Sequence, residues 1–465
     1  MTRTWRLGEL LLLVPALAIG LLAYAQVGFV HDGRLPQSFW TYAAIAVALA
    51  VVAHLVVRWR APAADQVMLP VVVALNGLGL ALIHRLDVAE ADNALAAGRA
   101  LPKPTAPSQL IWTTLGVGLF VAVLVVVRDP RMLQRLTYTA MAVGLALLVL
   151  PLVPGVGVSI NGARIWIHAL GFSFQPAEVG KLALIVFFAG YLMMKRDALA
   201  VARSRFLGVD LPRGRDLGPI LVAWLVSLGV LVFENDLGTS LLFFGLFVAM
   251  LYVATGRLSW VFIGMGLFLL GSFLAYHEFG HVRVRVDVWL RPFSDPGGAG
   301  YQTTQALFGL AHGGILGTGI GRGSPDLVPF AKSDFIVATI GEELGVTGLM
   351  AVLVLYAILV ERGLRTALAA RDVFGRLLAA GLAFVVGLQV FIVVGGVTGL
   401  IPLTGLTTPF MCAGGSSLIA NWMLVALLLR VSDSARRAVP TAGPAPAASP
   451  GSAQPSDAVT EVIRW

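Results

Sequence analysis

The residues best suited to chemistry lie in one Gly- and Pro-rich stretch, residues 289–348, inside an otherwise apolar chain. Asp295 is followed there by Pro-Gly-Gly-Ala-Gly, and Asp at the start of such a turn commonly bonds its own backbone. On residue type alone, this favours a turn-forming role. The context shifts the interpretation to catalysis, because three arginines lie nearby in sequence and no Ser/His or Cys/His set competes. A carboxylate in that position can accept a proton from an attacking hydroxyl group.

Basic residues precede this aspartate. Arg283 and Arg285 alternate with valine in VRVRVDVW, and this period of two predicts an extended or interfacial segment with both arginines on one side. Such a patch would attract the diphosphate of a lipid carrier. Attraction to anionic lipid head groups is the alternative, and the sequence does not separate the two. Arg164, beside Trp166 in the earlier loop 154–176, suits either phosphate oxygens or a position at the membrane interface.

A second set of ionisable residues lies at the start of an apolar run. Glu178 and Lys181 follow Pro176 with a spacing of three, so they share one face of a helix. They form either a structural ion pair between helices or a site for a lipid head group. Asp236 is expected to cap the helix that begins after it, because its side chain can accept from free backbone N–H groups.

The end of the Gly-rich stretch returns into an apolar run as SDFIVATIGEELG. Ser333 or Asp334 is expected to cap the helix that begins there. Glu342 and Glu343 lie a turn or two further on, where a carboxylate needs a partner. We therefore expect each to pair with an arginine or lysine of a neighbouring helix.

The elements that position these residues are membrane-spanning helices. The chain is 58% hydrophobic and 12% charged, whereas soluble domains carry about 25% charged residues. The net charge of +8 does not indicate nucleic acid, because the basic residues lie in short loops. The single cysteine, Cys412, excludes an internal disulfide and a cysteine-based metal cluster. Apolar runs of about 20 residues predict an all-α bundle of about twelve spans, near 8–28, 39–58, 67–86, 109–127, 136–153, 177–194, 218–234, 237–254, 259–276, 335–360, 374–400 and 410–430.

Lysine and arginine are concentrated in alternate loops, which predicts the orientation of the chain. Both termini are then cytosolic, and the loops 154–176 and 289–334 face the outside. The sequence divides into residues 1–60 with two spans, a membrane core over 61–432 that carries the extracytoplasmic loop 277–334, and a tail over 433–465. The tail is rich in Pro, Ala and Ser, a composition typical of disorder.

Taken together, these motifs resemble the SEDS proteins (shape, elongation, division and sporulation), to which RodA and FtsW belong. The first two spans look like additions to the ten-helix core of that family. The sequence departs from the family pattern at Asn235, at Ala413 and in PFAKSD, where the family more often has PExxTD. The matching segments occur in family order: NGARIWI, SFQPAEVGK, NDLGTSL, DPGGAGYQ, GGILGTGIG, SDFIVATIGEELG, LIPLTGLTTPF and GGSS.

The resemblance implies a peptidoglycan glycosyltransferase in the bacterial plasma membrane that polymerises lipid II, with a class B penicillin-binding protein as its partner. It implies that Asp295 is the catalytic residue and that Glu178 and Lys181 line a central cavity. Gln302, in DPGGAGYQ, is a further candidate for contact with substrate. A RodA-like elongation role is favoured over an FtsW-like division role.

The reaction would invert the donor's anomeric carbon in one displacement, which needs one base and stabilisation of a diphosphate. The residues give no metal site, although a divalent cation, Mg²⁺ or Mn²⁺, is compatible with this chemistry. Asp236, Asp334 and Glu343 are expected to be structural or to lie around the cavity. Two other functions are open: a lipid II flippase that uses Glu178 and Lys181, and a non-catalytic scaffold for the penicillin-binding protein.

Overall fold

The protein is a bundle of membrane-length helices in the computed structural model, which describes residues 7–160, 163–169, 172–200, 204–206, 209–211, 221–222, 224–229, 232 and 236–437. Within these residues, ten helices are long and apolar enough to cross a membrane. They are α1 (Leu7–Asp32), α2 (Phe39–Arg60), α3 (Met68–Ala96), α4 (Ala106–Val126), α7 (Pro176–Ala200), α9 (Leu237–Thr255), α10 (Ser259–Glu278), α14 (Gly345–Ala369), α15 (Val373–Val397) and α16 (Gly415–Arg436).

Most of the expected spans correspond to these helices, with three differences. The run 136–153 forms a shorter helix that continues into a 3-10 turn, and the run 218–234 lies partly outside the described residues. The run 335–360 is broken in two at Leu344 and Gly345. The shorter elements are α5 (Arg131–Gln134), α6 (Thr137–Val149), η2 (Leu150–Leu152), α11 (Gly280–Leu290), α12 (Tyr301–Gly313), η3 (Pro325–Leu327) and α13 (Ile336–Glu343).

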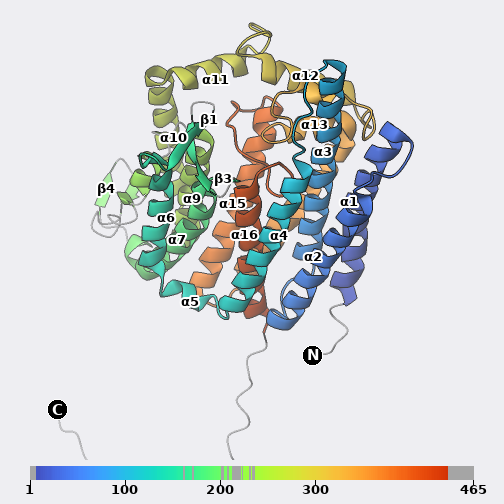
Figure 1. Ribbon diagram of the computed structural model, residues 1–465. Helices are drawn as coiled ribbons and strands as arrows, with labels where there is room; N and C mark the ends of the chain where they lie inside the picture. Colours follow the sequence, from blue (N-terminus) through green and yellow to red (C-terminus); the bar gives the residue numbers. More distant parts are fainter. Residues whose placement is uncertain are drawn as a thin grey trace, which may run out of the picture.

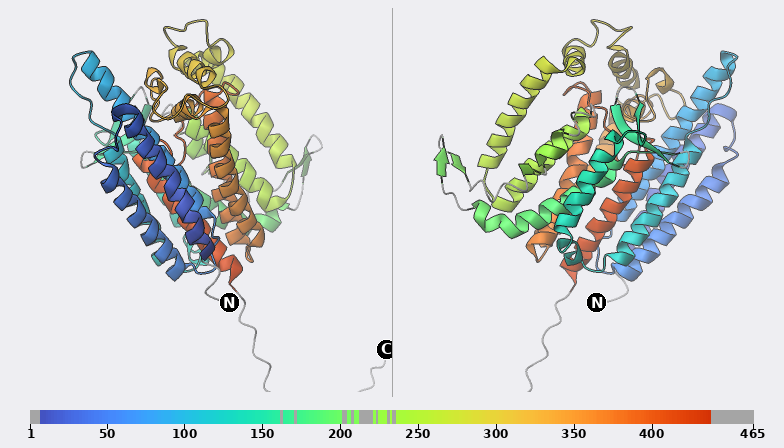
Figure 2. Two further views of the ribbon diagram at one scale, coloured as in Figure 1. Left: turned by 90° about the vertical axis from the view of Figure 1, so that its right-hand side faces the viewer. Right: turned by 60° about the vertical axis from the view of Figure 1, so that its left-hand side comes forward.

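The first residue of α1 and the last residue of α16 lie at the same end of the bundle, and α11 and α12 cover the opposite end (Figure 1). The core is built around α16, of which 89% of the apolar window is buried, together with α3, α7 and α15. By contrast, only 6% of the corresponding window of α10 is buried. Its apolar side chains, such as Phe262 and Phe273, face outward, and the helix stands away from the bundle (Figure 2).

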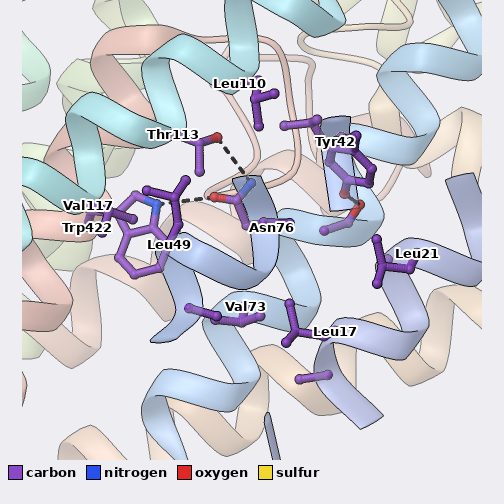
Figure 3. Close-up of a pocket in the computed structure, with 16 residues that line it drawn as sticks. Leu17, Leu21, Tyr42, Leu49, Val73, Asn76, Leu110, Thr113, Val117 and Trp422 are labelled. Atoms are coloured by element: carbon purple, nitrogen blue, oxygen red, sulfur yellow. Dashed lines mark hydrogen bonds between the residues drawn. The ribbon is translucent and has the colours of Figure 1, made fainter. Parts of the chain in front are cut away.

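The helices α1 and α2 pack against α3. Gly20 of α1 approaches Gly77 of α3 so closely that a Cβ atom on Gly20 would lie 2.8 Å from the Gly77 Cα. Beside this crossing is a small apolar cavity between α1, α2, α3 and α4 (Figure 3). Its polar groups satisfy one another, because Trp422 Nε1 donates to Asn76 Oδ1 at 3.1 Å. The cavity therefore presents an almost wholly apolar lining.

The expected outer loop 154–176 contains a small antiparallel sheet of three strands: β1 (Gly157–Ile160), β2 (Ala163–Ala169) and β3 (Phe172–Phe174). Trp166 of β2 pairs with Val158 of β1, and His168 pairs with Ser173 of β3. A separate two-stranded sheet, β4 (Ser204–Phe206) and β5 (Val209–Leu211), lies between α7 and α9 in the sequence.

The break between α13 and α14 is filled by the Gly-rich loop that follows α12. Thr318 N donates to Glu342 O at 3.0 Å, and Gly319 N donates to Glu343 O at 2.9 Å. Gly345 has φ +68°, a left-handed conformation that glycine adopts readily. Loop amides thus satisfy carbonyls that the end of a helix otherwise leaves without partners.

Candidate active site

Residues of α11 and α12 line a cavity of about 580 Å³. These two helices cover the end of the bundle opposite the start of α1 and the end of α16 (Figure 1). The walls of the cavity come from α11, the first turns of α12, the turn before α13 and the segment 396–405 after α15. Trp289 Nε1 donates to Gly399 O at 2.8 Å, which fastens α11 over this segment. The cavity is lined by both apolar and polar side chains, among them Arg285, Gln302 and Asp334.

The segment that carries Arg283 and Arg285 is a helix, so the expectation that both arginines project from one side of an extended or interfacial segment was wrong. Residues two apart on a helix point about 200° apart, since each residue turns by about 100°. Arg283 is exposed and donates to the carbonyls of Tyr276 and His277. Arg285 points inward and lines the cavity. The Val/Arg alternation suggested an extended segment because it has a period of two. A short helix at the edge of a bundle need not show the apolar stripe of period 3.6 that identifies longer helices.

Arg285 is held by backbone carbonyls. Its Nη1 donates to Thr404 O at 3.0 Å and to Leu403 O at 3.4 Å. Burial lowers the pKa of Arg285, whereas Asp236 and Asp334 act in the opposite direction. An arginine with fixed carbonyl contacts on one side presents its remaining N–H groups in a defined direction, which suits the oxygens of a phosphate.

Asp334 lines the cavity and does not cap the helix that follows. The helix α13 begins at Ile336 and has no side-chain cap, because the turn continues to Phe335. Burial raises the pKa of Asp334 to about 7, Arg285 opposes this, and Asp236 raises the pKa further. Its carboxyl group thus changes charge near neutral pH while facing the guanidinium group of Arg285.

Asp295 is not among the residues that line this cavity, but it contacts one of them. Its Oδ2 accepts from Ala299 N at 2.9 Å, and Ala299 itself lines the cavity. The carbonyl of Asp295 accepts from the amides of Gly298 and Gly300, which closes the turn expected for this sequence. The side chain is exposed, and Oδ1 has no hydrogen-bond partner among the described residues. Asp295 is therefore both a turn residue and a carboxylate with a free oxygen.

Gln302 belongs to the first turn of α12, which starts directly after this Asp295 turn. It is half-buried and lines the cavity beside Thr303. The motif DPGGAGYQ therefore contributes Gln302 to the cavity wall and holds Asp295 beside that wall through Ala299.

Glu178 and Lys181 lie elsewhere, inside the bundle. Both are buried, and Lys181 Nζ donates to Glu178 Oε2 and, at 3.1 Å, to Gln389 Oε1 of α15. Gln389 in turn donates to Thr407 O at 2.8 Å. The ion pair therefore lies within α7, and Lys181 connects that helix to α15 through Gln389. The segment 403–407 links it to the cavity, because Leu403 and Gly405 line the cavity wall.

Asp236 caps α9, with Oδ1 accepting from Thr239 N at 2.9 Å. Its other oxygen accepts from Gln175 Nε2 at 3.3 Å. Asp236 is thus buried where α7 and α9 begin. Its charge raises the pKa of Arg285 without a hydrogen bond between the two side chains.

Arg164 lies on β2 and donates to Val153 O at 3.3 Å. It is not among the residues that line the cavity, so the described contacts give it a role within its own sheet. His168 and Ser173, across β2 and β3, form another local contact of this kind at 3.1 Å.

Three residues around the site were missed by sequence reasoning, and all lie on or contact the outer end of α3. Arg85 Nε donates to Glu343 Oε1 at 2.8 Å, and Arg85 also donates to Gly323 O. Lys332 Nζ contacts Asp87 at 2.7 Å. The helix α3 continues ten residues past the expected end of its span, at 86. Arg85 is the residue from which the sequence could have indicated such a contact, because an arginine within an apolar run requires a polar or charged partner.

Glu342 has a different environment from Glu343. Its Oε1 accepts from Ser324 N at 2.8 Å and contacts His312 Nδ1 at 3.3 Å, so among the described residues the expected arginine or lysine partner is absent. Across the part of the chain that the structure describes, no group of three His, Cys, Asp or Glu side chains is placed to hold a metal ion.

Comparison with known proteins defines the class. Residues 66–437 match the family model described as "Cell cycle protein", which covers FtsW, RodA and SpoVE. The chain belongs to the FtsW/RodA/SpoVE family, which confirms the resemblance to SEDS proteins and the all-α polytopic membrane fold.

Within this family, RodA proteins are strongly similar to the chain. It is 51% identical to the peptidoglycan glycosyltransferase RodA of Mycobacterium tuberculosis, over 94% of this chain and 92% of that protein. Two solved structures share the fold. A chain of a peptidoglycan synthase complex has TM-score 0.63 and 28% identity, and RodA of Thermus thermophilus has TM-score 0.57 and 26% identity. In both cases, 81% of this chain and 99% of the other chain are covered.

Proposed function

We propose that this chain polymerises lipid II at the cavity beneath α11 and α12, with Asp295 as the general base. The chain is a RodA-like peptidoglycan glycosyltransferase and a multi-pass membrane protein, given its similarity to the mycobacterial RodA proteins over more than nine-tenths of its length. The observation that carries the proposal is the hydrogen bond from Ala299 N, in the cavity wall, to Asp295 Oδ2, which holds this exposed carboxylate next to a cavity lined by Arg285.

In the proposed reaction, the 4-hydroxyl of the acceptor's GlcNAc attacks the anomeric carbon of the donor's MurNAc. A new C–O bond forms as the bond from the anomeric carbon to the diphosphate oxygen breaks. The hydroxyl proton passes to Asp295, and undecaprenyl diphosphate leaves. One displacement inverts the α-linked donor to a β-1,4 product, so a single base suffices, in contrast to the two carboxylates of most glycosidases.

Asp295 suits the role of base because it is accessible and oriented. The amide of Ala299 fixes Oδ2 and leaves Oδ1 for the attacking hydroxyl. A general base must come within hydrogen-bond reach of the proton that it removes, which requires a position on the substrate side of the cavity.

Arg285 is the candidate for stabilising the leaving diphosphate. Backbone carbonyls orient it, and negative charge that develops in the transition state would be opposed by a preorganised cation. Arg164, Arg283 and Lys181, which were considered for this role, have other contacts: a carbonyl of the loop before β1, carbonyls of α10, and Glu178.

We further propose that the cavity faces the periplasmic side of the plasma membrane and that both termini are cytosolic. The Lys/Arg bias of the loops supports this orientation. The partner would be a class B penicillin-binding protein, since polymerised strands must be crosslinked. The similarity to a chain of a complex that coordinates polymerization and crosslinking supports this assignment.

The test is polymerisation of purified lipid II by the purified chain, with and without the partner. The wild-type chain should form glycan strands, and Asp295→Ala and Asp295→Asn should form none while keeping expression and thermal stability. Asp287→Ala is the matched control, because Asp287 is another exposed aspartate on the same side, eight residues earlier.

Two results would contradict the proposal. Strands of normal length from Asp295→Ala would remove Asp295 from the reaction. Translocation of lipid II in sealed vesicles without any strand formation by the wild-type chain would favour the flippase function instead.

A further inference from the structure

A buried lysine connects the turn before α13 to the outer end of α3. Lys332 Nζ lies 2.7 Å from Asp87 Oδ1 and 2.6 Å from Glu90 Oε2, and the lysine side chain is only 14% exposed. We refer to Lys332, Asp87 and Glu90 as the Lys332 cluster. A lysine that is mostly withdrawn from water and contacts two carboxylates is held more firmly than an exposed surface pair.

Asp87 joins the cluster to a second helix. Its two oxygens accept from Thr105 N at 2.9 Å and from Ala106 N at 2.7 Å, where α4 begins. The Thr105 hydroxyl is also within 3.4 Å of Lys332 Nζ. The cluster therefore rests on two helices of the bundle, so it forms a fixed point rather than a contact between two loops.

The turn that Lys332 holds is strained. Phe330 has φ +58°, a left-handed conformation that is unfavourable for a bulky residue. Such a conformation persists only where the surroundings enforce it. Ser333 N donates to Phe330 O at 2.9 Å, and Lys332 O accepts from Ala413 N at 2.7 Å. The side chain and the carbonyl of Lys332 thus fasten the turn on two sides.

Both flanks of this turn form part of the cavity wall. Phe330 and Asp334, two residues before and two residues after Lys332, line the cavity. Asp334 also interacts electrostatically with Arg285, which lines the same cavity. A shift of the turn would therefore move the apolar and the acidic parts of the wall together.

We propose that Lys332 is a positioning residue: it fastens the turn 328–335 to α3 and so sets the position of Phe330 and Asp334 relative to the wall segment 396–405. Its effect on catalysis rests on the proposed function, whereas its effect on the shape of the cavity does not. Without the ammonium group, the negative charges of Asp87 and Glu90 would have no neighbouring positive charge from Lys332, and the strained turn would lose its side-chain contact with α3.

The first experiment measures the shape. Spin labels are placed on Ser333→Cys, next to Asp334, and on Thr398→Cys, in the wall segment 396–405, and the distance distribution is recorded by pulsed electron resonance. The native cysteine, Cys412, is buried at 3% exposure and stays unlabelled. The doubly labelled chain with an intact Lys332 cluster should give one narrow distance distribution between the labels. The same chain with Lys332→Ala should give a broader or shifted distribution.

Two further variants control this measurement. Lys332→Arg keeps the charge and should restore the narrow distance. Arg322→Ala removes an exposed cation from the same loop and should leave the distance unchanged. If Lys332→Ala does not fold, Glu90→Lys gives the same test, because Glu90 is 45% exposed and its replacement opposes Lys332 with a like charge.

The second experiment measures lipid II polymerisation by the same variants. Lys332→Ala should lower kcat/KM by about tenfold or more, mainly through KM, since misplaced binding groups weaken catalysis at a distance. Lys332→Arg should recover most of the loss. A distance that stays narrow in both Lys332→Ala and Glu90→Lys overturns the proposal, as does equal loss of kcat/KM in Lys332→Ala and Lys332→Arg. If the wild-type chain forms no strands, the proposed function fails, and the spin-label distances still decide the role of Lys332.

Discussion

Gly298 lies directly against the carboxylate of Asp295: a Cβ atom added to Gly298 would be 2.7 Å from Oδ1 and closer still to Oδ2. That separation is shorter than real Cβ atoms tolerate, so the carboxylate can occupy its place in the turn only because residue 298 has no side chain. The glycine next to it differs, since a Cβ on Gly297 would meet nothing within 4 Å. The two neighbouring glycines therefore provide a matched pair.

Gly298→Ala is expected to displace the Asp295 carboxylate and to lower lipid II polymerisation by about tenfold to a hundredfold, because a base misplaced by about 1 Å loses much of its effect. Gly297→Ala should remain near wild-type activity. The measurement is the rate of strand formation at saturating lipid II, with thermal unfolding as the check on folding. Equal rates in the two variants would mean that the orientation of Asp295 does not limit the reaction.

The buried pair of Glu178 and Lys181 gives a prediction about stability. Either Lys181→Met or Glu178→Gln alone leaves a buried polar or charged group without its partner, which costs about 3–5 kcal/mol when the remaining group is charged. The double variant should recover much of this loss. The thermal unfolding temperatures of the four proteins in one detergent test this, and polymerisation should follow stability if the pair is structural. A stable but inactive double variant would instead indicate contact with substrate.

Asp334 predicts a dependence of stability on pH. Its folded-state pKa of about 7 is above the ordinary value of 3.8, so the folded state binds the proton more tightly than the unfolded state does. The stabilisation from this group is complete below about pH 4 and is lost as the pH rises to about 7. Asp334→Asn should therefore lose less thermal stability between pH 5 and pH 8 than the wild-type chain. Asp287→Asn, at an exposed aspartate, should keep the wild-type slope; the same slope in Asp334→Asn would contradict the assignment.

Arg85→Met should destabilise the chain more than replacement of any exposed arginine, for example Arg322→Met. It would leave Glu343 buried without its cation, for which the expected cost is about 3–5 kcal/mol. Adding Glu343→Gln should return part of this stability. Thermal unfolding of the two single variants and of the double variant measures the coupling, and additive losses would show that the pair contributes little.

Local interactions were the most predictable from sequence. The cap of α9 by Asp236 joins residues three apart, and the turn at Asp295 closes within five residues. Spanning helices followed from the length of the apolar runs alone. These features depend on a few consecutive residues, whose types determine the backbone.

Interactions between distant segments were not predictable in the same way. Arg85 and Glu343 are separated by 258 residues, and Lys332 and Asp87 by 245. A single sequence shows that each of these charges needs a partner but does not show which one. The helix of Arg285 was misread for a different reason: the alternation of valine and arginine in VRVRVDVW has the period of a strand, although these residues form α11.

The loop amides that bond the carbonyls at the end of α13 have a consequence for hydrogen exchange. A segment reading GILGTGIG would be expected from its composition to exchange its amide hydrogens within moments. Instead, the N–H groups of Thr318 and Gly319 are bonded to Glu342 and Glu343, so deuterium uptake there should be as slow as in the middle of α14.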